Sequence, residues 1–147
     1  VSEFDIWHDE KCEDLTKKAK EILNDTNSGE KLGFTYGVAA KLLNCYLKTI
    51  FVTQFIDSLS ATEKEKVSVI HPPIDRLLIN SIKNKLHLIY ADTEMEEKRK
   101  FWNSKDIQSW SLYEARDYKK VIGEIKQIQK KRNQPLWMIE AYWPGHQ

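Results

Sequence analysis

The segment from residue 34 to residue 55 constrains the fold most, because it has the pattern of one long, mostly apolar helix. At about 100° per residue, its apolar side chains fill a wide arc, made by Ala39, Leu42, Leu43, Tyr46, Leu47 and Ile50. An arc this wide indicates burial on more than one side. The remaining narrow strip has the spacing of one helical face and holds Gly37, Lys41, Asn44 and Lys48. We therefore predict that this helix lies at the centre of the fold.

The rest of the sequence predicts further helices on both sides of this segment. Glycine and proline are scarce, with five and four of 147 residues, which argues against a sandwich or barrel with many tight turns. Helical periodicity or capping signals occur in the ranges 9–24, 57–66, 74–88, 112–131 and 135–143. We therefore predict an all-α fold in which residues 1–147 form a single domain. Four or five main helices form a bundle around the central helix, and a short C-terminal aromatic helix docks on the body.

The charge balance argues against a global attraction to nucleic acid or membranes. The chain has 23 basic and 22 acidic residues and a formal net charge of +1, so anion binding must come from a local cluster. The longest apolar stretch, within residues 38–55, is interrupted by Lys41, Asn44 and Lys48, which is poor for a membrane span. The acidic start lacks the apolar region of a signal peptide. We expect a soluble, cytoplasmic protein that does not bind membranes.

The sequence offers little support for a metal or a cofactor. Cys12 and Cys45 lack the spacing of a zinc site, and Cys45 is expected to pack as a small apolar residue. The run Trp7-His8-Asp9-Glu10 combines a histidine with two acids, but it has no second histidine at ligand spacing. A helix N-terminus explains its acids better. We therefore expect neither a metal nor a cofactor.

The polar strip on the central helix is the first candidate site. Lys41 and Lys48 are seven residues apart with Asn44 between them. Two lysines can hold a phosphate or carboxylate as point charges, and the amide adds a directional donor. Gly37 would let a ligand or another backbone come close. The alternative is that the strip is only the solvent-facing edge of a buried helix.

The second candidate is the run His71-Pro72-Pro73-Ile74-Asp75-Arg76. Two prolines fix the backbone just before a predicted helix N-terminus, where free N–H groups favour an anion. His71 could act as a general acid or base, with Asp75 orienting it and Arg76 binding a phosphate. In the alternative interpretation, His71 caps the helix, Asp75 satisfies backbone donors, and Arg76 is solvated or ion-paired.

The third candidate is the aromatic segment 135–143 around Glu140. Aromatic side chains around one carboxylate can form a pocket for a ring, with Glu140 as acceptor or base. Burial beside tryptophan would raise the pKa of Glu140 and make it a better acid. The alternative is an apolar plug of the core, with Glu140 outside or in a salt bridge.

Taken together, these patterns predict a small binding domain for an anionic ligand such as nucleic acid or another phosphate-bearing molecule. The ligand would lie in one cleft lined by Lys41, Asn44, Lys48, His71 and Arg76. Such a cleft requires the strip and the His71 turn to be adjacent in space. The first alternative is an enzyme, a metal-independent phosphodiesterase or nuclease with His71 as acid–base, drawing on Asp75 or Glu140. The second is a protein-interaction module that uses the C-terminal aromatic segment.

Overall fold

The computed structural model describes residues 2–25, 33–53 and 56–142, and within these the chain is all-α, as predicted. The first elements are α1 (Glu3–Asp25), α2 (Tyr36–Leu47), a π-helical extension η1 (Lys48–Thr53) and α3 (Ala61–Val67). They are followed by α4 (Arg76–Asn84), α5 (Leu86–Ile89), α6 (Asp92–Asn103) and α7 (Lys105–Gln108). The chain continues through the 3-10 helix η2 (Trp110–Leu112), α8 (Ala115–Arg132) and the 3-10 helix η3 (Leu136–Tyr142).

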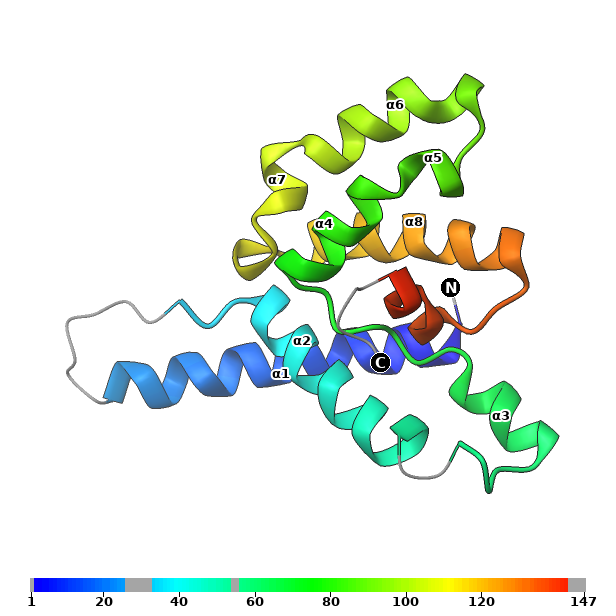
Figure 1. The fold of residues 1–147 in the computed structure, drawn as a ribbon. Coiled ribbons are helices and arrows are strands. Elements are labelled where there is room, and N and C mark those ends of the chain that lie inside the picture. Colours follow the sequence, from blue (N-terminus) through cyan, green and yellow to red (C-terminus); the bar gives the residue numbers. More distant parts are fainter. Residues whose placement is uncertain (1, 26–32, 54–55, 143–147) are drawn as a thin grey trace.

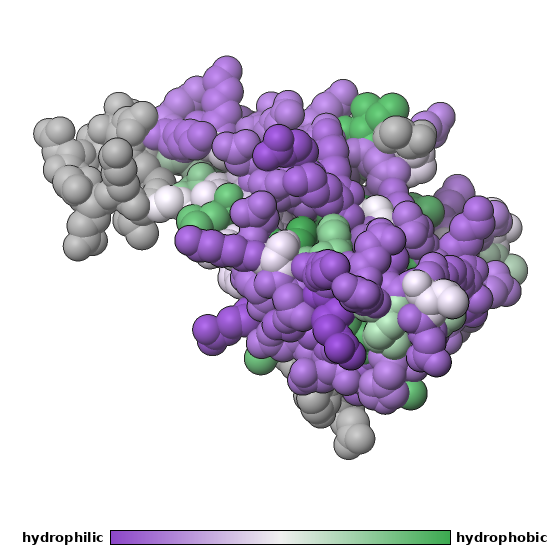
Figure 2. Space-filling model, turned by 90° about the horizontal axis from the view of Figure 1, so that it is seen from above, coloured by the Kyte–Doolittle hydropathy of each residue, from purple (hydrophilic) through white to green (hydrophobic). Residues whose placement is uncertain are grey.

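Figure 1 shows two groups of helices that meet along α8 and η3. One group contains α1, α2, η1 and α3, and the other contains α4 to α7. The long helices α1 and α8 run in opposite directions, and the second half of α1 extends beyond the body (Figure 1). Helix α2 contacts α1 within its own group and also η2 and α8. The face shown in Figure 2 is mainly hydrophilic, with separate small hydrophobic areas.

The main core lies where α2, α4, α6 and α8 come together. Its largest fully buried side chains include Trp102, Tyr113, Ile79, Ile82 and Ile125. Gly37 allows α2 to pack directly against the η2 segment, since an added Cβ would lie 2.1 Å from the Trp110 carbonyl oxygen. The Gly37 amide donates to the Tyr113 carbonyl at 3.0 Å. The close approach predicted at Gly37 is therefore to another part of the backbone.

The prediction for the faces of the central helix was wrong in part. Ala39 and Leu47 are buried as predicted, but Leu42 and Tyr46 are 55% and 63% exposed, and Asn44 is fully buried. Hydrophobic patterning predicts that a polar residue such as asparagine faces solvent. Asn44 can be buried because groups from other segments form hydrogen bonds with both its amide nitrogen and its amide oxygen. Cys45, expected to pack as an apolar residue, is exposed. The α-helical part of the predicted range is Tyr36–Leu47, and residues 54–55 lie outside the described residues.

Helix α1 begins at Glu3, six residues before the predicted start at Asp9. Asp5 and His8 therefore belong to the same helix as Cys12. This matters for the site, because residues three or four positions apart share one face of a helix.

Side-chain caps mark the starts of α3 and α4. Ser60 and Glu63 form a capping box at the start of α3, within the range 57–66. After the two prolines, α4 begins at Arg76 and is capped by Asp75, whose Oδ1 accepts from the Leu78 amide at 2.9 Å. Asp75, and not His71, is the capping residue.

Among the described residues, no helix is both long and apolar enough to cross a membrane.

Candidate functional site

A pocket with a volume of about 480 Å³ opens between α1 and α8. One wall is a face of α1 that includes Asp5, Ile6 and Asp9, and the other is a face of α8 that includes Ile122 and Gly123. Its floor is formed by Tyr36, His8, His71 and Tyr118. We call this cavity the α1/α8 pocket. Its size lies within the range of small-molecule sites, roughly 300–1,000 Å³.

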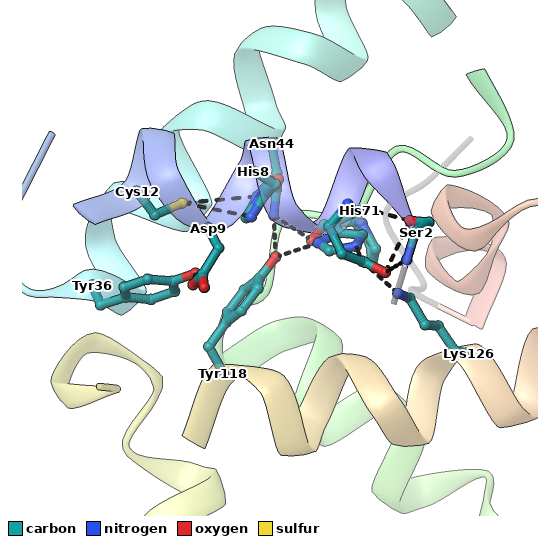
Figure 3. Close-up of polar contacts among 11 residues, drawn as sticks. Ser2, His8, Asp9, Cys12, Tyr36, Asn44, His71, Tyr118 and Lys126 are labelled. Carbon is teal, nitrogen blue, oxygen red and sulfur yellow. Dashed lines mark hydrogen bonds and ion pairs between the residues drawn. The ribbon is translucent and has the colours of Figure 1, made fainter. Parts of the chain in front are cut away.

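A chain of buried hydrogen bonds runs through the floor, and its donors can be assigned from two groups that can only accept (Figure 3). The Pro72 carbonyl can only accept, so the group 3.1 Å from it on Asn44 is the amide nitrogen. The same nitrogen donates to the Tyr118 hydroxyl at 2.9 Å. The ionised Asp5 carboxylate can also only accept, so the neutral His71 ring donates to Asp5 Oδ1 from Nε2 at 2.9 Å. His71 Nδ1 is then an acceptor, and the Tyr118 hydroxyl donates to it at 3.0 Å.

The other end of this chain runs back to α1. Because the Asn44 nitrogen faces Pro72, its Oδ1 faces His8 and accepts from His8 Nε2 at 2.8 Å. His8 Nδ1 is then an acceptor, and the Cys12 thiol lies 3.6 Å from it. Asn44 thus connects α1, the turn before α4, and α8.

The rings of the floor pack against one another. The His8 and His71 ring centres are 4.6 Å apart, and the His8 ring stacks on Tyr118 at 5.5 Å with an interplanar angle of 9°. Burial lowers the pKa of His8 to about 4, and the neighbouring His71 adds to this shift. Burial also lowers the pKa of His71, although its hydrogen bond to Asp5 opposes the shift. Both histidines are therefore neutral at pH 7.

Two ion pairs join α1 to α8 across the pocket. Lys119 Nζ lies 2.6 Å from Asp9 Oδ2, and Lys126 contacts Asp5. The other oxygen of Asp9 accepts from the Tyr36 hydroxyl at 2.7 Å. The hydrogen bond from His71, together with that from Lys126, holds the pKa of Asp5 well below its usual range. Asp5 is therefore an ionised acceptor for His71.

Gly123 leaves the α8 wall of the pocket open. It lies inside a long helix, where glycine costs about 1 kcal/mol relative to alanine. A Cβ built on Gly123 meets nothing within 4 Å, so no neighbouring group among the described residues requires a glycine here. Its effect is extra space in the pocket.

A second pocket, of about 370 Å³, lies on another side of α2. We call it the α2/α4 pocket, and its charged lining residues are Lys41, Lys48, Asp75 and Glu140. Lys41 Nζ is 3.1 Å from Asp75 Oδ2 and lies over the Trp110 ring, 4.6 Å from its centre. Lys48 forms an ion pair with Glu140, which is buried. Both lysines are therefore paired with carboxylates.

The structure divides the residues of the predicted cleft between these two places. Lys41 and Lys48 line the α2/α4 pocket, while Asn44 and His71 are joined through Tyr118 in the floor of the α1/α8 pocket. Arg76 is exposed on α4 and has no polar partner among the described residues. The helix N-terminus expected to hold an anion already holds the Asp75 carboxylate.

The candidate acids and the aromatic segment also have clear positions. Asp75 caps α4 and pairs with Lys41, so it does not orient His71; Asp5 does. Glu140 lies in the α2/α4 pocket beside Lys48. Segment η3 docks on α4 and α8, in agreement with the predicted docking, and Tyr142 contacts Lys85 and Arg132. Trp143 lies outside the described residues.

Sequence reasoning missed Asp5, His8 and Tyr118 as site residues. Asp5, His8 and Cys12 are spaced three and four residues apart, which would have placed them on one helical face if the start of α1 had been recognised. Tyr118 lies within the predicted helical range 112–131, and nothing in its local sequence indicates that its hydroxyl bridges two polar groups. Within the described ranges, no three His, Cys, Asp or Glu side chains are grouped so that they could hold a metal.

Comparison with known proteins adds no assignment to this geometry. The chain matches no family model, no curated protein and no solved structure. The function must therefore be argued from the residues of the two pockets.

Proposed function

We propose that this chain is a ligand-binding domain that holds a small organic molecule in the α1/α8 pocket. The observation that carries the proposal is the polar character of the floor. His8, His71 and Tyr118 line the open cavity, and Asn44 behind them joins them into one continuous hydrogen-bonded chain, each of the four being 3% exposed or less. Buried polar chains stabilise a core less than apolar packing of the same volume. Their concentration under a cavity whose exposed lining is more apolar than polar is typical of a binding site.

Gly123 supports the same proposal independently. A glycine that no neighbouring group requires, in the wall of a pocket, lowers helix stability and enlarges the pocket. The α2/α4 pocket offers less support. An anionic ligand there would have to displace Asp75 from Lys41 and Glu140 from Lys48. Binding of nucleic acid or another phosphate-bearing ligand by these lysines stays a prediction from the sequence.

Binding of a neutral ring tests the proposal. Phenol titrated into the isotopically labelled protein should shift the NMR signals of the His8 and His71 rings, with a dissociation constant on the order of millimolar for a molecule of this size. Gly123→Leu places a side chain in the pocket and should weaken phenol at least tenfold. Cys45→Leu makes the same kind of change beside the α2/α4 pocket and should leave phenol binding unchanged. Equal binding by all three proteins would refute the proposal.

A second candidate function, metal-independent phosphodiester hydrolysis with His71 as acid–base, is favoured by one observation. Asp5 accepts from one nitrogen of His71 while a hydroxyl donates to the other, the order that activates a nucleophilic hydroxyl in hydrolases. Hydrolysis of bis(4-nitrophenyl) phosphate in the presence of EDTA, abolished in His71→Asn and retained in the exposed-site control His87→Asn, would support it. No rate above background would remove this candidate and leave the binding proposal in place.

A further inference from the structure

The charges around the α1/α8 pocket are unevenly paired. Four carboxylates and two lysines line it, namely Asp5, Asp9, Glu10, Glu13, Lys119 and Lys126. Each lysine is paired with an aspartate. Glu10 and Glu13 are exposed, lie one turn apart on α1, and have no ion-pair partner among the described residues. The uncompensated charge at the mouth of the pocket is therefore negative.

The interior adds no positive charge to offset these glutamates. Burial keeps His8 and His71 neutral at pH 7, and both lysines already neutralise Asp5 and Asp9. Two exposed glutamates that line the pocket repel an anion and attract a cation. Besides the paired charges, the walls offer apolar surface from Ile6 on α1 and from Ile122 and Gly123 on α8.

We infer that the ligand of the α1/α8 pocket is a small organic cation that carries a ring. The ring lies between Ile6 and Ile122 above Gly123, and an ammonium or amidinium group lies at the mouth beside Glu10 and Glu13. This inference rests on the proposed function above and adds the charge of the ligand to it. It departs from the anionic ligand expected from the sequence, because the lysines of both pockets are paired whereas these glutamates are not.

Three probes with the same six-membered ring and different charges test the inference. Benzamidine is a cation, benzyl alcohol is neutral, and benzoate is an anion at pH 7. Dissociation constants are measured by NMR titration of the full chain at low ionic strength, where screening is weak. Benzamidine should bind at least tenfold more tightly than benzoate, with benzyl alcohol between them. Its advantage over benzyl alcohol should shrink severalfold in 0.5 M salt.

Two double variants then distinguish a local effect of Glu10 and Glu13 on binding from an effect of the net charge of the protein. The double variant Glu10→Gln/Glu13→Gln should reduce benzamidine affinity to that of benzyl alcohol and leave benzyl alcohol unchanged. The double variant Glu21→Gln/Glu97→Gln has the same net charge, and both substitutions lie at exposed positions outside the pocket. It should bind all three probes as the unmodified chain does.

The possible results distinguish failure of the inference from failure of the proposed function. If benzyl alcohol binds and Gly123→Leu abolishes its binding, while benzoate binds as tightly as benzamidine, the pocket is a ligand site and the cation inference is overturned. If benzamidine binds and Gly123→Leu does not weaken it, the cation is held at the surface and both statements fail. If none of the three probes binds, both statements also fail.

Discussion

One wall of each pocket is helical and carries two lysines seven residues apart. These are Lys119 and Lys126 on α8, and Lys41 on α2 with Lys48 at the start of its extension η1. In both pockets each lysine is paired with a carboxylate from another element. The two pockets differ in what lies between the lysines. In the α2/α4 pocket this position holds Cys45, whereas in the α1/α8 pocket it holds Gly123, above a floor of buried hydrogen bonds.

The sources of the carboxylates also differ. Asp5 and Asp9 both come from α1, so the ion pairs of the α1/α8 pocket fasten one helix to α8. Asp75 and Glu140 come from the start of α4 and from η3, so the pairs of the α2/α4 pocket join α2 to α4 and η1 to η3. Two lysines seven residues apart on a helix suggest an anion-binding site. The comparison shows that the same spacing also occurs where both lysines form ion pairs with carboxylates of the same chain.

Removal of Asn44 should have the largest effect. Asn44→Leu leaves the Pro72 carbonyl, the Tyr118 hydroxyl and the His8 ring nitrogen without their partner in the buried floor. We expect the free energy of unfolding to fall by about 4 kcal/mol, measured by urea denaturation. Asn103→Leu, the same change at an exposed position on α6, should cost no more than about 0.5 kcal/mol. If Asn44→Leu lowers the free energy of unfolding only slightly, the hydrogen bonds of the Asn44 amide do not stabilise the floor of the pocket.

The same residue shows how far the sequence could predict this molecule. The all-α class, the capping box at Ser60, the last long helix and the docking of the C-terminal segment follow from periodicity and capping, which are local. The burial of Asn44 does not, because its partners come from residues 28, 36 and 74 positions away. A pattern read along one helix cannot show which distant groups will satisfy a polar side chain.

The candidate site was predictable only in part for the same reason. Asn44 and His71 were identified, but they were assigned to one cleft with Lys41, Lys48 and Arg76. On a helix the two sides of a narrow strip can face different neighbours, and here Asn44 turns inward while the lysines lie at a pocket edge. Glu10, at the mouth of the α1/α8 pocket, was considered as a metal ligand and then attributed to the start of a helix.

The ion pairs of the α2/α4 pocket should differ in strength from each other. The Glu140 side chain is 3% exposed, so Lys48→Met leaves a buried carboxylate without its partner and should cost about 3 kcal/mol. The Lys41 and Asp75 side chains are 31% and 21% exposed, and water can replace the lysine. Lys41→Met should therefore cost less than about 1 kcal/mol. Thermal and urea unfolding of both variants measure the difference, and equal losses would contradict this view of the pocket.

The two pockets should also respond differently to acid, because only the α1/α8 pocket is lined by histidine among the described residues. Below about pH 6.5 the unfolded chain binds a proton at His8, whereas the folded chain does not until about pH 4. The free energy of unfolding should therefore fall as the pH drops from 6.5 to 4.5, by about 2 kcal/mol from His8 alone. The lowered pKa of His71 adds a loss of the same sign.

Asp5 contributes in a separate range, because its pKa is lowered in the folded chain and its stabilisation is lost only below about pH 4. Urea denaturation at several pH values measures the slope. His8→Gln should flatten the profile between pH 6.5 and 4.5, and His87→Gln, at an exposed position, should leave it unchanged. A profile already flat in the unmodified chain would mean that the histidines are protonated in the folded protein.

The smallest expected effect is a gain in stability on substitution of Gly123. It compares the two pockets at equivalent positions. Gly123 and Cys45 occupy corresponding positions, each four residues after the first lysine of its helix. Gly123→Ala should raise the free energy of unfolding by about 1 kcal/mol, because α8 gains helix propensity and the new Cβ meets nothing within 4 Å. Cys45→Ala should change it by less than about 0.5 kcal/mol, since the side chain is exposed. If Gly123→Ala is more stable yet binds phenol more weakly, Gly123 favours ligand binding and lowers the stability of the fold. If Gly123→Ala is less stable than the unmodified chain, the fold itself requires the glycine.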